Sequence, residues 1–214
     1  MSVLDAFKED GYQVGDYVAL LYDPARVDVF GEEWIADAYR RLKGSPYSQK
    51  SKANTTLQYL FCGMGNLSFN AIVSYLSQLK IVVVGKWEGD VFISYGFAFI
   101  TITTRTPSDA MAFIGYGFFK EAWGCPETEL LTMLALCYFF KEFNLCAIHG
   151  VRYVENRSTA RFMRRFGFND DGIVPKYMLK GDKLVSAVVS SCLREDFEQY
   201  VEEKLISGLV EASD

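Results

Sequence analysis

The chain has 214 residues, of which 50% are hydrophobic, 15% aromatic and 23% charged. This composition supplies enough apolar surface for one domain with a sizeable core, and it excludes disordered and collagen-like chains. Apolar runs such as residues 134–140 are far shorter than the roughly 20 residues that a membrane-spanning helix requires. We therefore expect a globular protein that does not act in a membrane.

The charge balance argues against a nucleic-acid partner. The formal net charge is −5 at pH 7, whereas binding to a phosphate backbone draws its affinity from clustered lysine and arginine. The first residues also lack the basic segment and the small-residue cleavage site of a secretory signal. We therefore expect the protein in the cytoplasm.

The cysteines predict neither a disulfide framework nor a metal site. Their number is odd, they are scattered without a Cys-x-x-Cys pair, and the chain has a single histidine, His149. We expect the thiols to pack as small hydrophobic groups. The five residues are Cys62, Cys125, Cys137, Cys146 and Cys192.

Two amphipathic helices are expected in the first third of the chain. Apolar residues recur at helical spacing in residues 31–42 and again in residues 68–79. The polar stretch 43–55 between them, with its glycine and proline, indicates a surface loop. Both helices are expected to precede the sheet.

Three consecutive strands follow at residues 81–84, 91–104 and 110–119. These segments are rich in β-branched and aromatic residues. Turn-forming residues, Gly89-Asp90 and Pro107-Ser108-Asp109, separate them. Short turns join antiparallel strands, so we expect an antiparallel meander.

The remaining residues predict a crossover. A long apolar helix is expected at 126–143, and an alternating strand at 146–154. A short helix at 156–166 follows and ends at Gly167, where a left-handed residue suits a helix C-terminus. Two strands, 177–179 and 184–190, and a final helix from Arg194 complete the chain.

This order of elements predicts an α+β fold with a mixed, mainly antiparallel sheet. The single βαβ crossover requires one parallel pair, strands 110–119 and 146–154. Where those strands splay at their C-terminal ends, a crevice opens beside the N-terminus of the helix between them, and such crevices bind ligands. We expect one domain over 1–214, with a helical region at 1–79 and a ligand-binding core at 80–200.

The segment that enters the crossover helix resembles a known loop. Ile114-Gly115-Tyr116 and, further on, Trp123-Gly124-Cys125-Pro126-Glu127-Thr128-Glu129 resemble the acetyl-CoA pyrophosphate loop of the GCN5-related N-acetyltransferases (GNAT), and more closely the ribosomal-protein N-terminal acetyltransferase branch. A helix N-terminus offers unpaired N–H groups to a diphosphate. Pro126 stands where the family has a second glycine and removes one donor, and the loop is one residue shorter. An ordinary helix-entry turn has the same local pattern.

A second segment aligns with the same family without a gap. Residues 156–168 match its Asn-x-x-Ser … Gly-Phe motif, Asp171-Gly172 falls on its Glu-Gly, and residues 190–197 resemble its last strand and the helix that follows. The resemblance covers roughly residues 80 to 200. It implies that Asn156 contacts the pantetheine arm and that Thr159 lies near the thioester sulfur as a proton donor. The alternatives are a helix N-cap for Asn156 and a first-turn hydroxyl for Thr159.

The resemblance further implies acetyl-CoA as cofactor and direct transfer of its acetyl group to an amine, either a protein N-terminus or a small molecule. Backbone donors for the oxyanion are implied at Phe118 and Phe119, and a contact with the 3′-phosphate of CoA for Arg161 or its neighbours Arg164 and Arg165. Phe113 and Met163 occupy positions that are acidic or tyrosine in family branches, so Glu121 and Tyr153 are weighed for catalysis, together with Glu155 and His149. The implied cofactor-binding residues are Phe118, Phe119, Trp123, Gly124, Cys125, Pro126, Glu127, Thr128, Asn156 and Arg161.

Two other functions stay open at this point. A catalytically weak or inactive acyl-CoA-binding protein on the same fold would explain the departures at Phe113, Pro126 and Met163. An aromatic-rich interaction module without a CoA site would explain the aromatic content as core alone.

Overall fold

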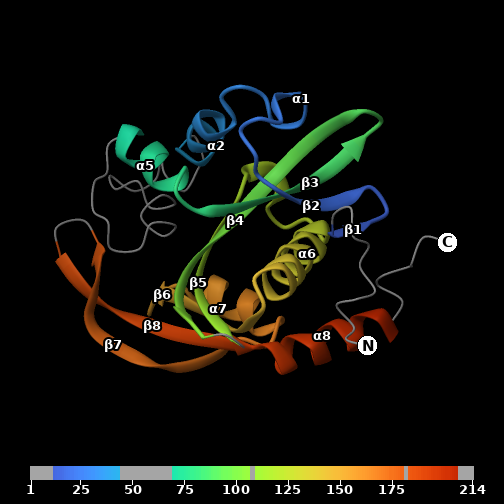
Figure 1. Ribbon diagram of the computed structural model, residues 1–214. Coiled ribbons are helices and arrows are strands. Elements are labelled where there is room, and N and C mark those ends of the chain that lie inside the picture. The colour runs from blue at the N-terminus through green and yellow to red at the C-terminus, as the bar shows by residue number, and fades with distance from the viewer. Residues whose placement is uncertain (1–11, 44–68, 107–108, 181–182, 207–214) are drawn as a thin grey trace.

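A central eight-stranded sheet organises the molecule (Figure 1). The computed structural model describes residues 12–43, 69–106, 109–180 and 183–206. In the described chain the strand order is β1-β2-β3-β4-β5-β6-β8-β7, and only β5 and β6 pair in parallel. The predicted α+β class, with a mainly antiparallel sheet and one parallel pair, is confirmed.

The elements run as follows in chain order. The first part contains β1 (Tyr12–Val14), β2 (Tyr17–Leu21), α1 (Val27–Phe30), α2 (Trp34–Lys43) and α5 (Phe69–Leu76). The meander contains β3 (Lys80–Glu88), β4 (Val91–Arg105) and β5 (Ala110–Phe118). The short 3₁₀ helix η2 (Lys120–Ala122) leads to α6 (Glu127–Glu142), β6 (Leu145–Tyr153) and α7 (Arg157–Arg164). The chain continues through β7 (Asn169–Lys180), β8 (Lys183–Leu193) and α8 (Arg194–Ile206).

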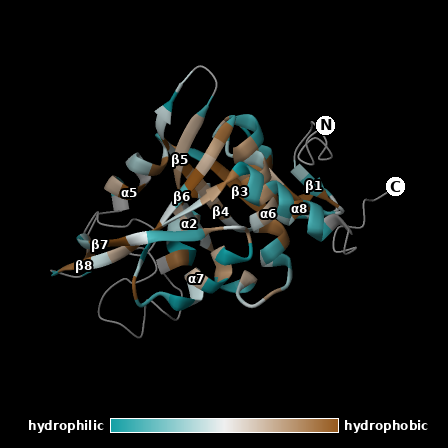
Figure 2. Ribbon diagram, turned by 90° about the horizontal axis from the view of Figure 1, so that it is seen from below, coloured by the Kyte–Doolittle hydropathy of each residue, from teal (hydrophilic) through white to brown (hydrophobic). Residues whose placement is uncertain are grey.

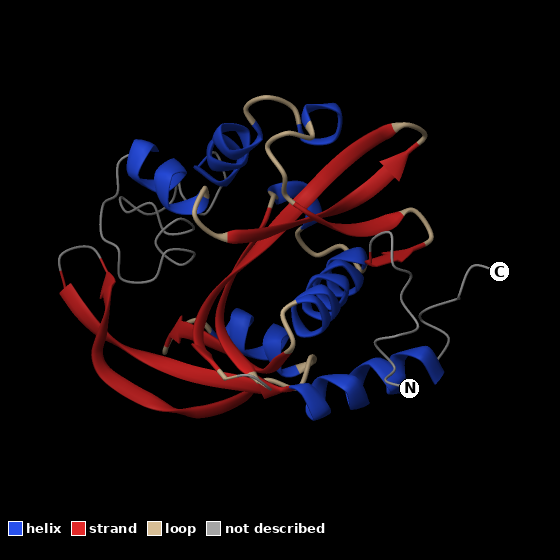
Figure 3. Cartoon of the chain, in the orientation of Figure 1, coloured by secondary structure: helices blue, strands red, loops and turns tan. Residues whose placement is uncertain are grey.

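Helices cover both faces of the sheet (Figure 3). One core cluster joins α6, α7 and α8 to the sheet and includes Phe140, Phe166 and Phe197, all fully buried. A second cluster joins α1, α2 and α5 to the opposite face through Trp34, Phe97 and their neighbours. Figure 2 shows hydrophobic residues concentrated in the central strands and α6. As its apolar faces predict, α6 is buried on more than one side.

Two parts of the sheet differ from the prediction. The expectation that only helices precede the sheet was wrong, because β1 and β2 come first, and strands of three and five residues are too short to show a period. Strand β7 begins at Asn169 rather than at residue 177. Its first nine residues are exposed on the sheet edge, so they do not alternate between polar and apolar.

The remaining early predictions have mixed outcomes. Loop residues 44–55 and Cys62 lie outside the described residues. Cys137 and Cys192 are buried thiols, whereas Cys125 and Cys146 are half-buried. In the described part of the chain, no helix is both long and apolar enough to cross a membrane.

Candidate active site

The parallel pair β5–β6 is joined only at its beginning. Pairing runs from Ala110 with Leu145 to Phe113 with His149 and stops there. Beyond this point β5 continues along β4, and β6 continues along β8, so the two strands diverge. The predicted splayed pair is therefore present, and its open edge is available to a ligand.

A cleft of about 890 Å³ fills this fork and extends to the N-terminus of α6. Its walls come from β5, the loop before α6, β6 and α7. Eight of the residues that the resemblance assigns to catalysis or cofactor binding line it: Phe118, Trp123, Gly124, Cys125, Pro126, Thr128, Asn156 and Thr159. The alternatives Glu155 and Arg165 line it as well.

The loop before α6 satisfies most of its own hydrogen bonds. The N–H groups of Cys125, Thr128 and Glu129 donate to carbonyls three residues earlier. Gly124 adopts φ +75°, a left-handed conformation in which glycine is unstrained. Within the described residues, the N–H groups of Gly124 and Glu127 donate to no protein acceptor. Two donors and the positive end of the α6 dipole therefore remain for an anion.

The end of β5 is held in a defined orientation. The Trp123 indole donates to the Phe118 carbonyl at 3.0 Å, and the Phe119 N–H donates to the Tyr95 carbonyl on β4 at 2.8 Å. Because donors alternate along a strand, the N–H groups of Tyr116 and Phe118 point to the open edge. The expectation that Phe119 supplies an oxyanion donor was therefore wrong, since its N–H is already used and its side chain is buried in the second core cluster.

The start of α7 forms the facing wall. Asn156 is the N-cap, as its residue type predicts, and its Oδ1 accepts the Thr159 N–H at 3.2 Å. The side chain of Thr159 lies close enough to the Tyr116 hydroxyl on β5 to affect its pKa. Burial raises the pKa of Tyr116 to about 12, although the nearby Thr159 side chain acts in the opposite direction. The phenol therefore remains protonated and uncharged at neutral pH.

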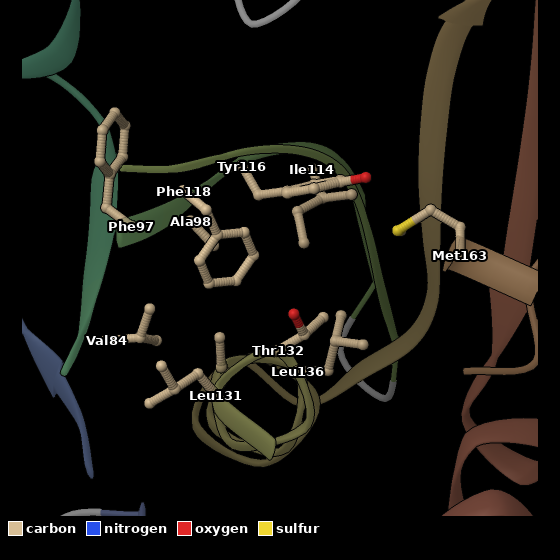
Figure 4. Close-up of a pocket in the computed structure, with 11 residues that line it drawn as sticks. Val84, Phe97, Ala98, Ile114, Tyr116, Phe118, Leu131, Thr132, Leu136 and Met163 are labelled. Atoms are coloured by element: carbon tan, nitrogen blue, oxygen red, sulfur yellow. The ribbon is translucent and has the colours of Figure 1, made fainter. Parts of the chain in front are cut away.

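Tyr116 also separates the cleft from a small void in the core. The void has a volume of about 10 Å³, at the lower limit for holding a water molecule, and its lining is almost entirely apolar. Figure 4 shows Phe118 and Leu131 beside it, while the Tyr116 hydroxyl is directed away, toward the side that carries Met163. Ile114, Tyr116 and Phe118 line both spaces. The void belongs to the core, and the Tyr116 ring forms a wall of the cleft.

The carboxylates of the cleft, Glu129 and Glu155, and two of its arginines, Arg152 and Arg165, form ion pairs. Glu129 contacts Arg165 at 2.9 Å, Lys204 at 2.8 Å and the Tyr200 hydroxyl at 3.1 Å. Burial raises the pKa of Glu129, but the hydrogen bonds from Lys204, Tyr200 and Arg165 outweigh it, and the pKa is lowered. Arg152 on β6 contacts Asp170 at 2.9 Å.

Five predicted site residues do not line the cleft. Glu121 is exposed and pairs with Arg41 at 3.5 Å. Tyr153 is buried on the opposite sheet face, and its hydroxyl donates to the Leu179 carbonyl at 2.6 Å. Strand alternation explains this placement, because the neighbouring Arg152 faces the cleft. Glu127 accepts from the Tyr17 hydroxyl at 3.4 Å, and Arg161 is exposed. Phe119, described above, is the fifth.

Sequence reasoning missed two of the lining residues that matter most. Tyr116 belongs to the quoted Gly-Tyr segment, so its place on β5 beside the fork was a usable signal. Arg152 gave no signal, because an arginine in an alternating strand is expected on the exposed face. The basic residues that do line the cleft are Arg152, Arg157 and Arg165.

Comparison with known proteins identifies the fold. No protein-family model matches the sequence, and no curated protein matches it. Ribosomal-protein-S5-alanine acetyltransferase from Vibrio fischeri superposes with a TM-score of 0.62 at 16% identity, covering 87% of this chain and 98% of that one. Spermidine N-acetyltransferase from Vibrio cholerae, in complex with CoA and spermine, gives 0.64 at 14% identity, with 85% and 98% covered.

Mycobacterium smegmatis RimJ, in complex with CoA-disulfide, gives a TM-score of 0.62 at 15% identity, covering 91% of this chain and 90% of that one. A Bacillus anthracis acetyltransferase described as a member of the GNAT family also superposes, at 0.55 and 15% identity. The chain therefore has the GNAT acetyltransferase fold.

Proposed function

We propose that this chain is an N-acyltransferase that moves an acetyl group from acetyl-CoA directly to an amine in a ternary complex. The observation that carries the proposal is the open β5–β6 fork, whose cleft of about 890 Å³ ends at unused N–H groups before α6. Acetyl transferases among the solved structures of this fold support the same chemistry.

The residues of the cleft fit the parts of acetyl-CoA. The N–H groups of Gly124 and Glu127 and the start of α6 would hold the diphosphate. The open-edge N–H groups of Tyr116 and Phe118 would hold the arm and the developing oxyanion. The amide of Asn156 would contact the pantetheine portion. When bound, acetyl-CoA supplies an activated acyl group, and the amine attacks its carbonyl carbon.

The acceptor is proposed to approach from the side of the N-terminal helical region, residues 1–79. Among the described residues the lining holds no histidine, and the two carboxylates found there, Glu129 and Glu155, both have cationic partners. An α-amino group has a pKa of about 8, so a useful fraction is neutral without a base. We therefore expect a protein N-terminus or a small amine as acceptor, with a rate that rises as that amine deprotonates.

The second candidate is an acyl-CoA-binding protein with weak or no catalysis. It is favoured by Pro126, which has no N–H to offer, and by Glu127 and Glu129 in the first turn of α6, where a diphosphate would meet negative charge.

Two measurements separate these functions. Calorimetric titration with CoA tests the site itself, and the absence of binding at millimolar CoA would contradict both candidates. Release of free thiol from acetyl-CoA with a panel of amines and N-terminal peptides tests turnover. Binding without thiol release above the buffer rate would favour the second candidate.

A pair of glycine variants tests the anion end of the cleft. Gly124 and Gly89 both have positive φ, and an added Cβ at either would meet nothing within 4 Å. Alanine at either site therefore brings the same backbone strain, but only Gly124 lines the cleft. We expect Gly124→Ala to weaken CoA binding about tenfold, equivalent to loss of one charge-assisted hydrogen bond, and Gly89→Ala to leave it unchanged. Equal effects in the two variants would place the diphosphate elsewhere.

A further inference from the structure

Arg152 is a buried cation on the wall of the cleft. Its side chain is only 9% exposed, and it lines the cleft from β6. Nη2 donates to Asp170 Oδ2 at 2.9 Å, and Nη1 donates to the Tyr153 carbonyl at 3.5 Å. A guanidinium has five N–H donors, so most of its donors find no acceptor among the described residues. A buried charge with unused donors is costly unless an anion meets it.

The Asp170 carboxylate does not neutralise this site fully. The same Oδ2 atom also accepts from Arg164 at 2.8 Å, so one carboxylate faces two guanidinium groups. Burial raises the pKa of Asp170, but the bonds from Arg152 and Arg164 outweigh it and keep the group ionised. Arg164 is 60% exposed and screened by water, whereas Arg152 is not. One positive charge therefore remains at the buried end.

Strand register places Arg152 opposite Tyr116. The last β5–β6 pair is Phe113 with His149, and Tyr116 and Arg152 each lie three residues beyond it. They lie on opposite walls of the fork at the same register position, and the side chain of Thr159, on α7, lines the cleft beside Tyr116. The anion end of the cleft lies at Gly124, so the opposite end of an extended ligand enters the fork toward these residues.

The other charged groups of the cleft do not cancel Arg152. Glu129 is held by Arg165 and Lys204, and Glu155 is held by Lys180. Arg157 adds further positive charge. The Tyr116 phenol, with a pKa of about 12, contributes a proton donor and no charge.

We propose that the guanidinium of Arg152 stabilises the CoA thiolate as it leaves, assisted by the Thr159 hydroxyl. This inference rests on the proposed function. As the nitrogen of the neutral amine bonds to the acyl carbon, the carbon–sulfur bond breaks and its electron pair stays on sulfur beside Arg152. The proton lost by the nitrogen passes to water. No acid needs to stand at the position of Met163, because the sulfur leaves as a stabilised anion.

The test compares the affinities of CoA and desulfo-CoA by calorimetry between pH 7 and pH 10. The ratio of the two affinities isolates the sulfur, because every other contact is shared. Beside Arg152 the bound thiol is expected to ionise at a lower pH than the thiol of free CoA. The ratio of CoA affinity to desulfo-CoA affinity should therefore rise about tenfold between pH 7 and pH 10, which corresponds to a thiol pKa lowered by about one unit on binding. In Arg152→Gln we expect a flat ratio.

Arg164→Gln is the matched control. It removes a guanidinium from the same Asp170 oxygen but leaves the cleft wall intact. We expect it to reduce the rise only in part, because Asp170 then pairs with Arg152 alone while the Arg152 guanidinium still lines the cleft. Arg152→Lys keeps the positive charge and should retain part of the rise. If Arg152→Gln does not fold, the comparison of Arg152→Lys with the wild type tests the role of Arg152 instead.

Each alternative outcome has its own meaning. A flat ratio in the wild type, or equal effects of Arg152→Gln and Arg164→Gln, overturns the role of Arg152. A tenfold preference for succinyl-CoA over acetyl-CoA with an unshifted thiol also overturns it, because Arg152 would then bind an acyl carboxylate. If the CoA to desulfo-CoA affinity ratio rises with pH but no amine is acetylated, the result supports the role of Arg152 beside the sulfur and contradicts the proposed acetyltransferase activity. If neither CoA nor desulfo-CoA binds to the wild type, both the role of Arg152 and the proposed function are overturned.

Discussion

Gly167 shows how one residue fixes the end of the helix that carries Asn156 and Thr159. It leaves α7 with φ +84°, and an added Cβ would lie 3.2 Å from the Asp196 side chain on α8. Only glycine meets both requirements without strain. The residue therefore sets the direction in which the chain turns from α7 into β7.

Gly167→Ala is expected to lower the free energy of unfolding by about 1–2 kcal/mol, from left-handed strain alone, with more if Asp196 cannot move. Urea denaturation measures this. Gly172→Ala is the control, because it has no positive φ and a Cβ there meets nothing within 4 Å. A cost at Gly172 as large as at Gly167 would show that strain at the helix end is not the cause.

At the scale of elements, Glu129 joins three helices. It lies in the first turn of α6, and it pairs with Arg165 just beyond α7 and with Lys204 on α8. An acidic residue at this position also suits the α6 dipole. The ion pairs of Glu129 therefore hold the start of α6, at the anion end of the cleft, to the end of α7 and to α8.

Glu129→Gln is expected to cost about 1 kcal/mol at pH 7, the upper end for partly exposed pairs. The pKa of Glu129 is lowered on folding, so its stabilisation is present above the unfolded pKa of about 4.3 and is lost as pH falls through the folded value. The difference in stability between variant and wild type should therefore shrink progressively as the pH falls below about 4.3. Urea midpoints at pH 7 and pH 3.5 check this, and a pH-independent difference would contradict it. Glu88→Gln, an exposed residue 3.9 Å from Lys86, should have no effect.

At the scale of the molecule, the cleft joins parts that come from distant sequence. The first core cluster includes α6, α7 and α8, and the fork lies between β5 and β6. A ligand in the cleft contacts β5, the loop before α6, β6 and α7 at once. Its binding energy therefore stabilises the whole core against unfolding.

CoA at 100 times its dissociation constant should add about 2.7 kcal/mol to the stability. For a chain of this size that corresponds to a rise of roughly 5–10 °C in Tm, measurable by thermal scanning. Gly124→Ala should need about ten times more CoA for the same rise, because its added methyl group would keep the diphosphate away from the N–H groups of the loop. An unchanged Tm at millimolar CoA would count against a site in this fork.

The sequence by itself determined the features that depend on local chemistry. The order of the main elements, the N-cap at Asn156, the left-handed Gly167 and the loop before α6 all follow from residue type and short spacing. These local signals suffice because capping and turn geometry involve residues only a few positions apart. The eight predicted site residues that line the cleft came instead from the resemblance to the GNAT family.

Only the tertiary structure decided which groups face the ligand. The use of the Phe119 N–H by Tyr95, the burial of Tyr153 on the far face and the exposure of Arg152 to the cleft depend on strand phase and register. A shift of one residue reverses every side chain in a strand, and pairing between distant strands sets that phase. The short strand β2 likewise forms because β3 offers it an edge, and β1 in turn pairs with β2.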